Sequence, residues 1–218
     1  NDTITSGAGV DSITSGAGVD IITGGAGADV INAGAGNDSY RYTAATEGAD
    51  VITGFATGTN KFVFTADVDG SGETADVFDA SAVVFADTDG TSTLGAVVGL
   101  ASTDYAEGAS ADNFFADNHV VVWTHAAGAA SEAAALTAIA AGGSSITDHS
   151  SVFLVWYDSA NTVVTLSYIS DTGDATPAGG AAAHSNNSSS TIATFSDVAA
   201  ADIATTFSAD NFAVESLA

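Results

Sequence analysis

The chain of 218 residues carries 27 acidic side chains against only two basic ones, which gives a formal net charge of −25. This charge excludes nucleic acid as a partner, because the phosphate backbone would be repelled. The absence of cysteine fits an exported protein that is not built around disulfides. No apolar run is long enough for a transmembrane helix, so we expect no membrane insertion.

The first 42 residues repeat every nine residues. In each unit, two glycines and an Asp mark a turn of six residues, and three β-forming residues follow as a strand. The recurring acidic residues are Asp2, Asp11, Asp20, Asp29 and Asp38. The recurring inward-facing residues are Ile4, Ile13, Ile22, Ile31 and Tyr40. A flexible glycine-rich linker would not keep these positions in register, so the pattern predicts a folded repeat.

Two units make one coil of eighteen residues with a strand on each face. This places Asp2, Asp20 and Asp38 in one column, and Asp11 and Asp29 in another. Carboxylates stacked at a strand spacing of roughly 4.8 Å repel one another unless a cation lies between them. A hard divalent cation with roughly six to eight oxygen ligands suits such a site, and Ca²⁺ fits better than Mg²⁺, which needs tight octahedral geometry.

Residues 6–41 resemble the GGxGxDxUx repeats of the RTX family, whose members are exported by type I secretion. The first position of the motif is Ser6, Ser15 or Ala33 here, and glycine only at Gly24. Because this position is needed for its carbonyl group, we expect the sites to be retained. The resemblance implies that the turns bind Ca²⁺ and that the strands form a parallel β-roll.

The resemblance also implies which groups hold calcium, namely the Asp side chains and the carbonyls of the first and third turn positions. We expect about three or four ions. The predicted ligands are Asp2, Ser6, Ala8, Asp11, Ser15, Ala17, Asp20, Gly24, Ala26, Asp29, Ala33, Ala35, Asp38 and Asp50.

Asp50 is included because the turn pattern recurs once more, twelve residues after Asp38 instead of nine. An insertion of three residues still allows Asp50 to face Asp29. A solvated turn residue remains the alternative for Asp50. The aromatic residues that follow are expected to cap the open end of the isoleucine column, and they are Phe55, Phe62 and Phe64.

Residues 66–125 contain short β-patterns separated by acidic turns, with apolar runs at 83–85, 94–100 and 119–123. Asp67 and Asp69 match the first half of an EF-hand loop, but Phe78 stands where that loop needs Glu. We expect acidic turns here and around 87–89, and whether Asp67 and Asp69 bind a further Ca²⁺ stays open.

Residues 128–143 predict the one clear helix, with Ser131 as N-cap and two glycines, 142–143, as its end. Its expected buried residues are Leu136, Ile139 and Ala140. Residues 151–157 and 162–169 predict a β-hairpin around a turn at 158–161. A low-complexity loop at 176–190 and a further strand at 191–195 follow.

The sequence therefore predicts a mainly β protein. A short parallel β-roll at 1–55 packs against a mostly antiparallel, β-sandwich-like domain at 56–218 with one short helix. Residues 207–218 resemble the uncleaved C-terminal segment that type I secretion machinery recognises, and a terminal edge strand is the alternative. Because Asn1 and Asp2 occupy the fifth and sixth positions of a repeat, we expect a longer parent chain.

No catalytic motif was found, so we expect no enzymatic activity in this chain. Its histidines are expected to be structural, and they are His119, His125, His149 and His184. Trp123, Trp156 and Tyr157 are expected in the core or at its rim.

Two functions remain. The first is the calcium-dependent folding and secretion module of a structural cell-surface protein, such as an S-layer protein or adhesin, that self-assembles or contacts cell-surface polysaccharide. The second is the same module of a secreted protease, lipase or epimerase whose catalytic domain lies upstream. Both place the protein outside the cell, where calcium is plentiful.

Overall fold

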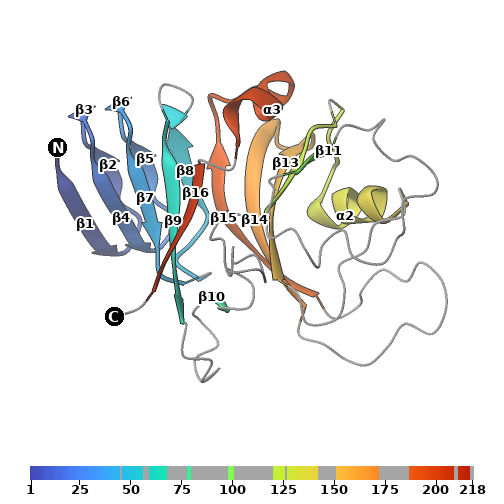
Figure 1. Cartoon of the computed structure of the whole chain (residues 1–218), viewed down its shortest axis with the longest axis horizontal. Coiled ribbons are helices and arrows are strands. Elements are labelled where there is room, and N and C mark those ends of the chain that lie inside the picture. Colours follow the sequence, from blue (N-terminus) through green and yellow to red (C-terminus); the bar gives the residue numbers. More distant parts are fainter. Residues whose placement is uncertain are drawn as a thin grey trace, which may run out of the picture.

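The computed structural model describes residues 1–44, 46–55, 59–67, 78–79, 98–100, 120–125, 127–141, 151–171, 187–208 and 211–216. Two sheets dominate it, one of six strands and one of eight, and a two-stranded pair lies beside them. The chain begins at one end of the molecule, and the C-terminal half extends away from that end (Figure 1).

The N-terminal part is a parallel β-roll, as predicted. In the six-stranded sheet its strands are β1 (Thr3–Ala8), β4 (Ile21–Ala26), β7 (Ser39–Tyr42) and β9 (Lys61–Asp67). In the eight-stranded sheet they are β2 (Ser12–Thr14), β5 (Val30–Asn32) and β8 (Asp50–Thr53). The short pair is β3 (Ala17–Gly18) with β6 (Ala35–Gly36). All of these neighbours pair in parallel.

The apolar repeat positions form the thin core of the roll. Ile4 lies opposite Ile22, which lies opposite Tyr40, which lies opposite Phe62. Ile22, Tyr40 and Phe62 are each at most 1% exposed. The nine-residue period therefore works as predicted, because two units return the chain to the same face.

The C-terminal half is built around a hairpin, as predicted. Strands β13 (Ser151–Asp158) and β14 (Val163–Asp171) pair antiparallel, and β14 pairs antiparallel with β15 (Asn187–Phe195). On the other side of β13, strand β12 (Val120–Trp123) pairs in parallel, followed by β11 (Val98–Leu100). Strand β15 begins at Asn187, so the predicted loop is wrong at 187–190. These residues are Asn and Ser, which are typical of loops but here belong to a strand.

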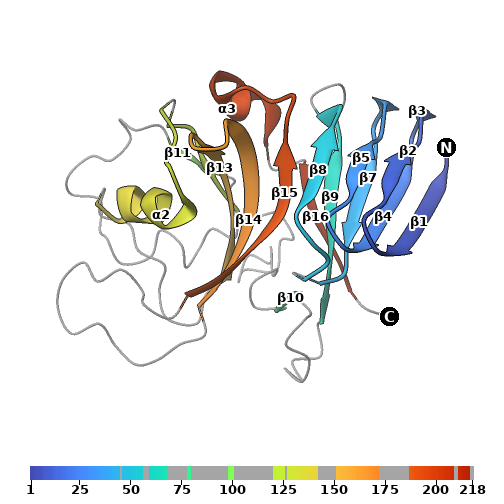
Figure 2. The same ribbon diagram turned by 180° about the vertical axis from the view of Figure 1, so that it is seen from behind.

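Both sheets of the roll continue into the C-terminal half. Strand β15 pairs in parallel with β8 and sets Phe195 opposite Ile52. Strand β16 (Phe212–Ser216) pairs in parallel with β9 and sets Phe212 opposite Phe62, while the short β10 (Phe78–Asp79) pairs with the end of β9. Figures 1 and 2 show β16 beside β9, and β15 next to β8, between the two halves. The joint between β8 and β15 crosses the predicted domain boundary after residue 55, whereas β9 and β16 both lie on its C-terminal side.

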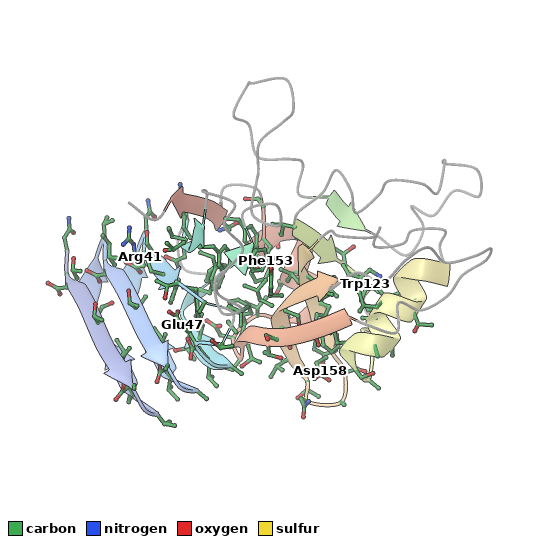
Figure 3. The ribbon with its side chains drawn as sticks, turned by 90° about the horizontal axis from the view of Figure 1, so that it is seen from below. Arg41, Glu47, Trp123, Phe153 and Asp158 are labelled. Atoms are coloured by element: carbon green, nitrogen blue, oxygen red, sulfur yellow. The ribbon has the colours of Figure 1, made fainter. Side chains whose placement is uncertain are left out.

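An aromatic cluster fills the junction of the two halves. Phe55 packs 5.2 Å from Phe62, 5.2 Å from Phe207 and 5.0 Å from Phe195, measured between ring centroids. Phe64 stacks on Phe153, which lies in the interior of the molecule (Figure 3). The predicted aromatic cap therefore exists, and it is shared with the C-terminal sheet.

Helix α2 (Glu132–Ala141) begins where predicted, because the Ser131 Oγ accepts a hydrogen bond from the Ala134 N–H at 3.2 Å. Its Ala135 side chain is fully buried and Leu136 is half-buried, whereas the side chains of Ile139 and Ala140, also predicted to be buried, lie outside those that the structure describes. A short 3-10 turn η2 (Ala200–Asp202) and helix α3 (Ile203–Thr206) precede β16. Among the described residues, no helix has the length and apolar character needed to cross a membrane.

Several predicted features lie outside the described residues. These are Asp69 of the EF-hand-like turn, residues 83–85 and 87–89, glycines 142–143, and His119, His149 and His184. Asp67 ends β9. Trp123 and Trp156 are buried, and the ring of Trp123 stacks on half-buried His125 with 5.1 Å between centroids.

Candidate calcium-binding site

The turn aspartates stack into two hydrogen-bonded columns. In the first column, the Asp2 N–H donates to Asp20 Oδ1 at 2.6 Å, and the Asp20 N–H donates to Asp38 Oδ1 at 2.9 Å. In the second column, the Asp11 N–H donates to Asp29 Oδ1 at 2.8 Å. In each pair, Oδ1 of the Asp that comes later in the sequence is therefore fixed by a backbone N–H of the preceding coil.

Asp50 lies in the second column, facing Asp29. The Asp29 N–H donates to Asp50 Oδ1 at 2.9 Å across a sequence separation of 21 residues. The three inserted residues are absorbed in the turn, and Ile31 still lies opposite Ile52. Asp50 is 1% exposed, so the alternative of a solvated turn residue does not describe it.

The second oxygens of the inner aspartates are buried without a partner. Asp20, Asp29 and Asp38 have no exposed surface, and the Oδ2 atom of each receives no hydrogen bond. An unpaired buried carboxylate oxygen carries a large desolvation cost, which a bound cation removes. The three unpartnered atoms therefore fit a divalent cation held between the coils.

One of these oxygens, Asp29 Oδ2, converges with Asp50 Oδ2 beside Gly24. A Cβ atom at Gly24 would lie 2.5 Å from Asp29 Oδ2 and 3.5 Å from Asp50 Oδ2. Both carboxylates thus point to the same small space next to the first turn position, and a side chain there would compete for it. Asp29, Asp50 and the Gly24 carbonyl are the groups that would hold an ion here, because carboxylates and carbonyls are the ligands Ca²⁺ prefers.

The glycines bring the turns close enough to stack. At Gly27, φ is +137° and a Cβ atom would lie 1.7 Å from the Gly9 carbonyl oxygen, which no side chain could tolerate. The Gly9 N–H donates to the Ala26 carbonyl at 2.7 Å. This hydrogen bond leaves the second lone pair of the Ala26 carbonyl, a predicted ligand, for a cation.

The serines at the first turn position have a role that sequence reasoning missed. The Ser6 hydroxyl donates to the Gly24 carbonyl at 2.5 Å, and the Ser15 hydroxyl donates to the Ala33 carbonyl at 2.7 Å. Both acceptors are predicted ligands in the next coil. The other residues whose carbonyls are predicted calcium ligands stack in register, with Ala8 opposite Ala26 and Ala17 opposite Ala35.

The first column continues beyond the predicted residues. The Asp38 N–H donates to Asn60 Oδ1 at 2.8 Å, so Asn60 occupies the place that an Asp would take. Sequence reasoning missed Asn60 because it follows Asp38 by 22 residues and is not acidic. The only available signal was the Gly-x-Asn spacing before the strand at residue 61.

Burial and hydrogen bonding shift the pKa values of Asp50 and Asp20 in opposite directions. Burial raises the pKa of Asp50 to about 6, against the opposing effect of the Tyr42 hydroxyl, which donates to Asp50 Oδ2 at 2.6 Å. Protonation of Asp50 therefore stabilises the metal-free fold at low pH, and this contribution is lost as the pH rises through about 6. The Asp2 amide lowers the pKa of Asp20, so that carboxylate is held charged.

No cluster of three or more Asp, Glu, His or Cys side chains that could hold a metal occurs among the described residues. The columns do not need one, because each step between two aspartates offers two carboxylates, and turn carbonyls would complete the oxygen set of a bound ion.

Residues 5–40 match the RTX calcium-binding nonapeptide repeat in four copies. Neither the curated proteins nor the solved structures include a match to this chain. The matched residues include Asp11, Asp20, Asp29 and Asp38, whereas Asp2 precedes the match and Asp50 follows it. The N-terminal part of this chain is therefore an RTX calcium-binding region, a module typical of proteins exported by type I secretion.

Proposed function

We propose that this chain is the calcium-dependent folding and secretion module of an extracellular protein exported by type I secretion. The observation that carries the proposal is the set of buried Oδ2 atoms without partners, at Asp20, Asp29 and Asp38. A net charge of −25 adds to the effect, because the metal-free chain repels itself. In a calcium-poor cytoplasm the roll stays open, and it closes outside the cell.

A calcium titration of the 218-residue chain, followed by circular dichroism, tests this proposal. We expect β-structure and thermal stability to rise together with calcium and to be lost again on addition of chelator. Magnesium at the same concentration serves as the control and is expected to have little effect. An unchanged spectrum and melting temperature in chelator would refute the proposal.

For the parent protein we propose a structural role at the cell surface, as an S-layer protein or adhesin, and no enzymatic activity for this chain. Support comes from the lack of a catalytic motif and from basic side chains limited to Arg41 and Lys61. Electron microscopy of the intact protein should reveal ordered sheets on calcium addition. An HExxH or GxSxG motif upstream, with hydrolytic activity, would instead favour the exoenzyme.

We further propose that the C-terminal segment, residues 207–218, is what the type I secretion machinery binds. Phe207 and Phe212 are buried and stack with 6.5 Å between centroids, so these two rings are accessible only before the chain folds. Fusing residues 207–218 to an unfolded passenger should direct its export, with a scrambled segment as the control. Equal export of both fusions would contradict this assignment.

A further inference from the structure

The two columns end in chemically different groups. The second ends in Asp50, whose Oδ1 accepts the Asp29 N–H at 2.9 Å. The first ends in Asn60, whose Oδ1 accepts the Asp38 N–H at 2.8 Å. The two residues therefore occupy equivalent places, but one is an acid and the other an amide.

The nitrogen of the Asn60 side chain points at two carbonyl oxygens. Nδ2 donates to the Phe55 carbonyl at 2.9 Å and to the Gly54 carbonyl at 3.3 Å. Because the Asp38 N–H requires an acceptor and the two carbonyls require donors, the surrounding groups fix the orientation of the amide. Asn60 has no exposed surface, so water does not substitute for these partners.

A carboxylate at this position would set an anionic oxygen against the same two carbonyl oxygens. That arrangement is repulsive unless a cation lies between them, as proposed for the inner steps of the columns. The amide hydrogens of Asn60 supply the positive partner instead. In the second column, Asp50 provides a carboxyl group at the equivalent place. Its Oδ2 atom faces the space beside Gly24 and would lie 3.5 Å from a Cβ atom built on that glycine.

The C-terminal segment is fastened to this same residue. The Asn60 carbonyl accepts a hydrogen bond from Asn211 Nδ2 at 2.7 Å, and Asn211 Oδ1 accepts from the N–H of Ser208 at 2.7 Å and from its hydroxyl at 2.9 Å. Asn211 is 5% exposed and directly precedes β16. The end of the first column is thus held by neutral hydrogen bonds on both sides.

We infer that Asn60 terminates the first calcium column with its side-chain amide, so that the step between Asp38 and residue 60 binds no ion. The second column, which ends in Asp50, binds an ion at its last step. This inference rests on the proposed calcium function. It assigns to Asn60 the role of a metal-independent cap that joins the roll to the C-terminal strand.

The substitution Asn60→Asp in the 218-residue chain tests the inference. Native mass spectrometry should count one more bound calcium ion than in the unmodified chain, and the melting temperature in chelator should fall. The matched control is Asn37→Asp, because Asn37 is exposed, lies in the stacked turn below, and accepts the Thr59 N–H at 3.2 Å through Oδ1, an atom that Asp keeps. The control should leave the ion count unchanged.

The reciprocal substitution Asp50→Asn keeps the inference testable if the first variant folds poorly. It removes a buried charge and should lower the ion count by one. An unchanged count in a folded Asn60→Asp chain, or in Asp50→Asn, overturns the inference. If the unmodified chain binds no calcium at all, it is the proposed function that fails.

Discussion

At the scale of single residues, the two oxygens of each inner aspartate have separate tasks. In Asp20, Oδ1 accepts the Asp2 N–H at 2.6 Å, whereas Oδ2 is buried without a partner. The first oxygen holds the coils in register, and the second would supply charge to a bound cation. The same division holds for Asp29 and Asp38.

Asp20→Ala should harm the protein more than Asp11→Ala. Asp20 lies between Asp2 and Asp38 and is fully buried, whereas Asp11 lies at the outer coil and is half-buried. We expect a greater loss of bound calcium and a lower melting temperature for Asp20→Ala, measured by native mass spectrometry and calorimetry. Equal ion counts in the two variants would argue against the stacking of shared sites.

Gly27→Ala should cost far more stability than Gly9→Ala. Both glycines have positive φ, +137° and +128°, but a Cβ at Gly27 would meet the Gly9 carbonyl oxygen at 1.7 Å, whereas nothing lies within 4 Å of one at Gly9. We expect about 1–2 kcal/mol for Gly9→Ala, from backbone strain alone. Gly27→Ala should exceed that in urea unfolding, since the coils must separate, and equal losses would contradict this account.

The role of the aspartates could be predicted from the sequence because an acidic residue recurs at the same position of each nine-residue unit. Asp50 could be placed because one insertion left its turn pattern intact. Asn60 could not, because an amide in an irregular turn carries no sign of belonging to a carboxylate column. The Ser6 and Ser15 hydrogen bonds were missed for a related reason, since they depend on which carbonyl lies in the next coil.

At the scale of elements, the joint between β8 and β15 determines how the roll ends. The Thr194 hydroxyl donates to the Asp50 carbonyl at 3.2 Å, and Phe195 lies opposite Ile52. A parallel roll would otherwise end in an open edge with unpaired backbone groups. The C-terminal half supplies the next strand to each sheet, through β15 and β16.

Phe195→Ala should destabilise both halves together. Phe195 has no exposed surface and packs 5.0 Å from Phe55 and 5.8 Å from Phe62, between ring centroids. We expect a loss of about 3–5 kcal/mol in urea unfolding in the presence of calcium, and a higher calcium concentration at the folding midpoint. Phe195→Leu is the control and should lose much less, because most of the buried volume is kept. Unfolding of the two halves at separate midpoints would contradict a shared core.

These joints could not be predicted from the sequence. The hairpin at 151–169 and the roll strands follow from local periodicity, which alternation and turn residues encode. The pairing of β15 with β8 joins residues 143 positions apart, such as Phe195 and Ile52, and no local pattern encodes such a partner. The first residues of β15, Asn187 to Ser190, resemble a polar loop, and only their pairing with β14 makes them a strand.

At the scale of the whole molecule, we expect net charge and size to change together when calcium binds. A net charge of −25 favours an expanded chain until cations are bound. For 218 residues, a compact chain has a radius of gyration of about 17 Å and an unfolded one roughly 50 Å. Small-angle X-ray scattering should show the chain expand toward the larger value in chelator.

Sodium chloride distinguishes screening from site binding in the same experiment. At about 1 M the Debye length is only about 3 Å, so repulsion between exposed charges is largely removed. We expect partial contraction but no cooperative folding, because the buried oxygens of Asp20, Asp29 and Asp38 need a cation in direct contact. Full folding in salt and chelator would mean that screening alone suffices.

Successive coils of the roll stack in a single row, and this arrangement has a mechanical consequence. Strand β1 pairs with β4 along the sheet, and the turns of successive coils are joined by hydrogen bonds such as those from Asp2 to Asp20 and from Asp11 to Asp29. A force that pulls the outermost coil away would break the contacts of that coil with the next one and leave the packing of the aromatic junction in place. Each released coil of eighteen residues adds about 60 Å of chain. The roll would therefore yield coil by coil as an extensible tether, and stop yielding where the amide of Asn60 and the joined sheets begin.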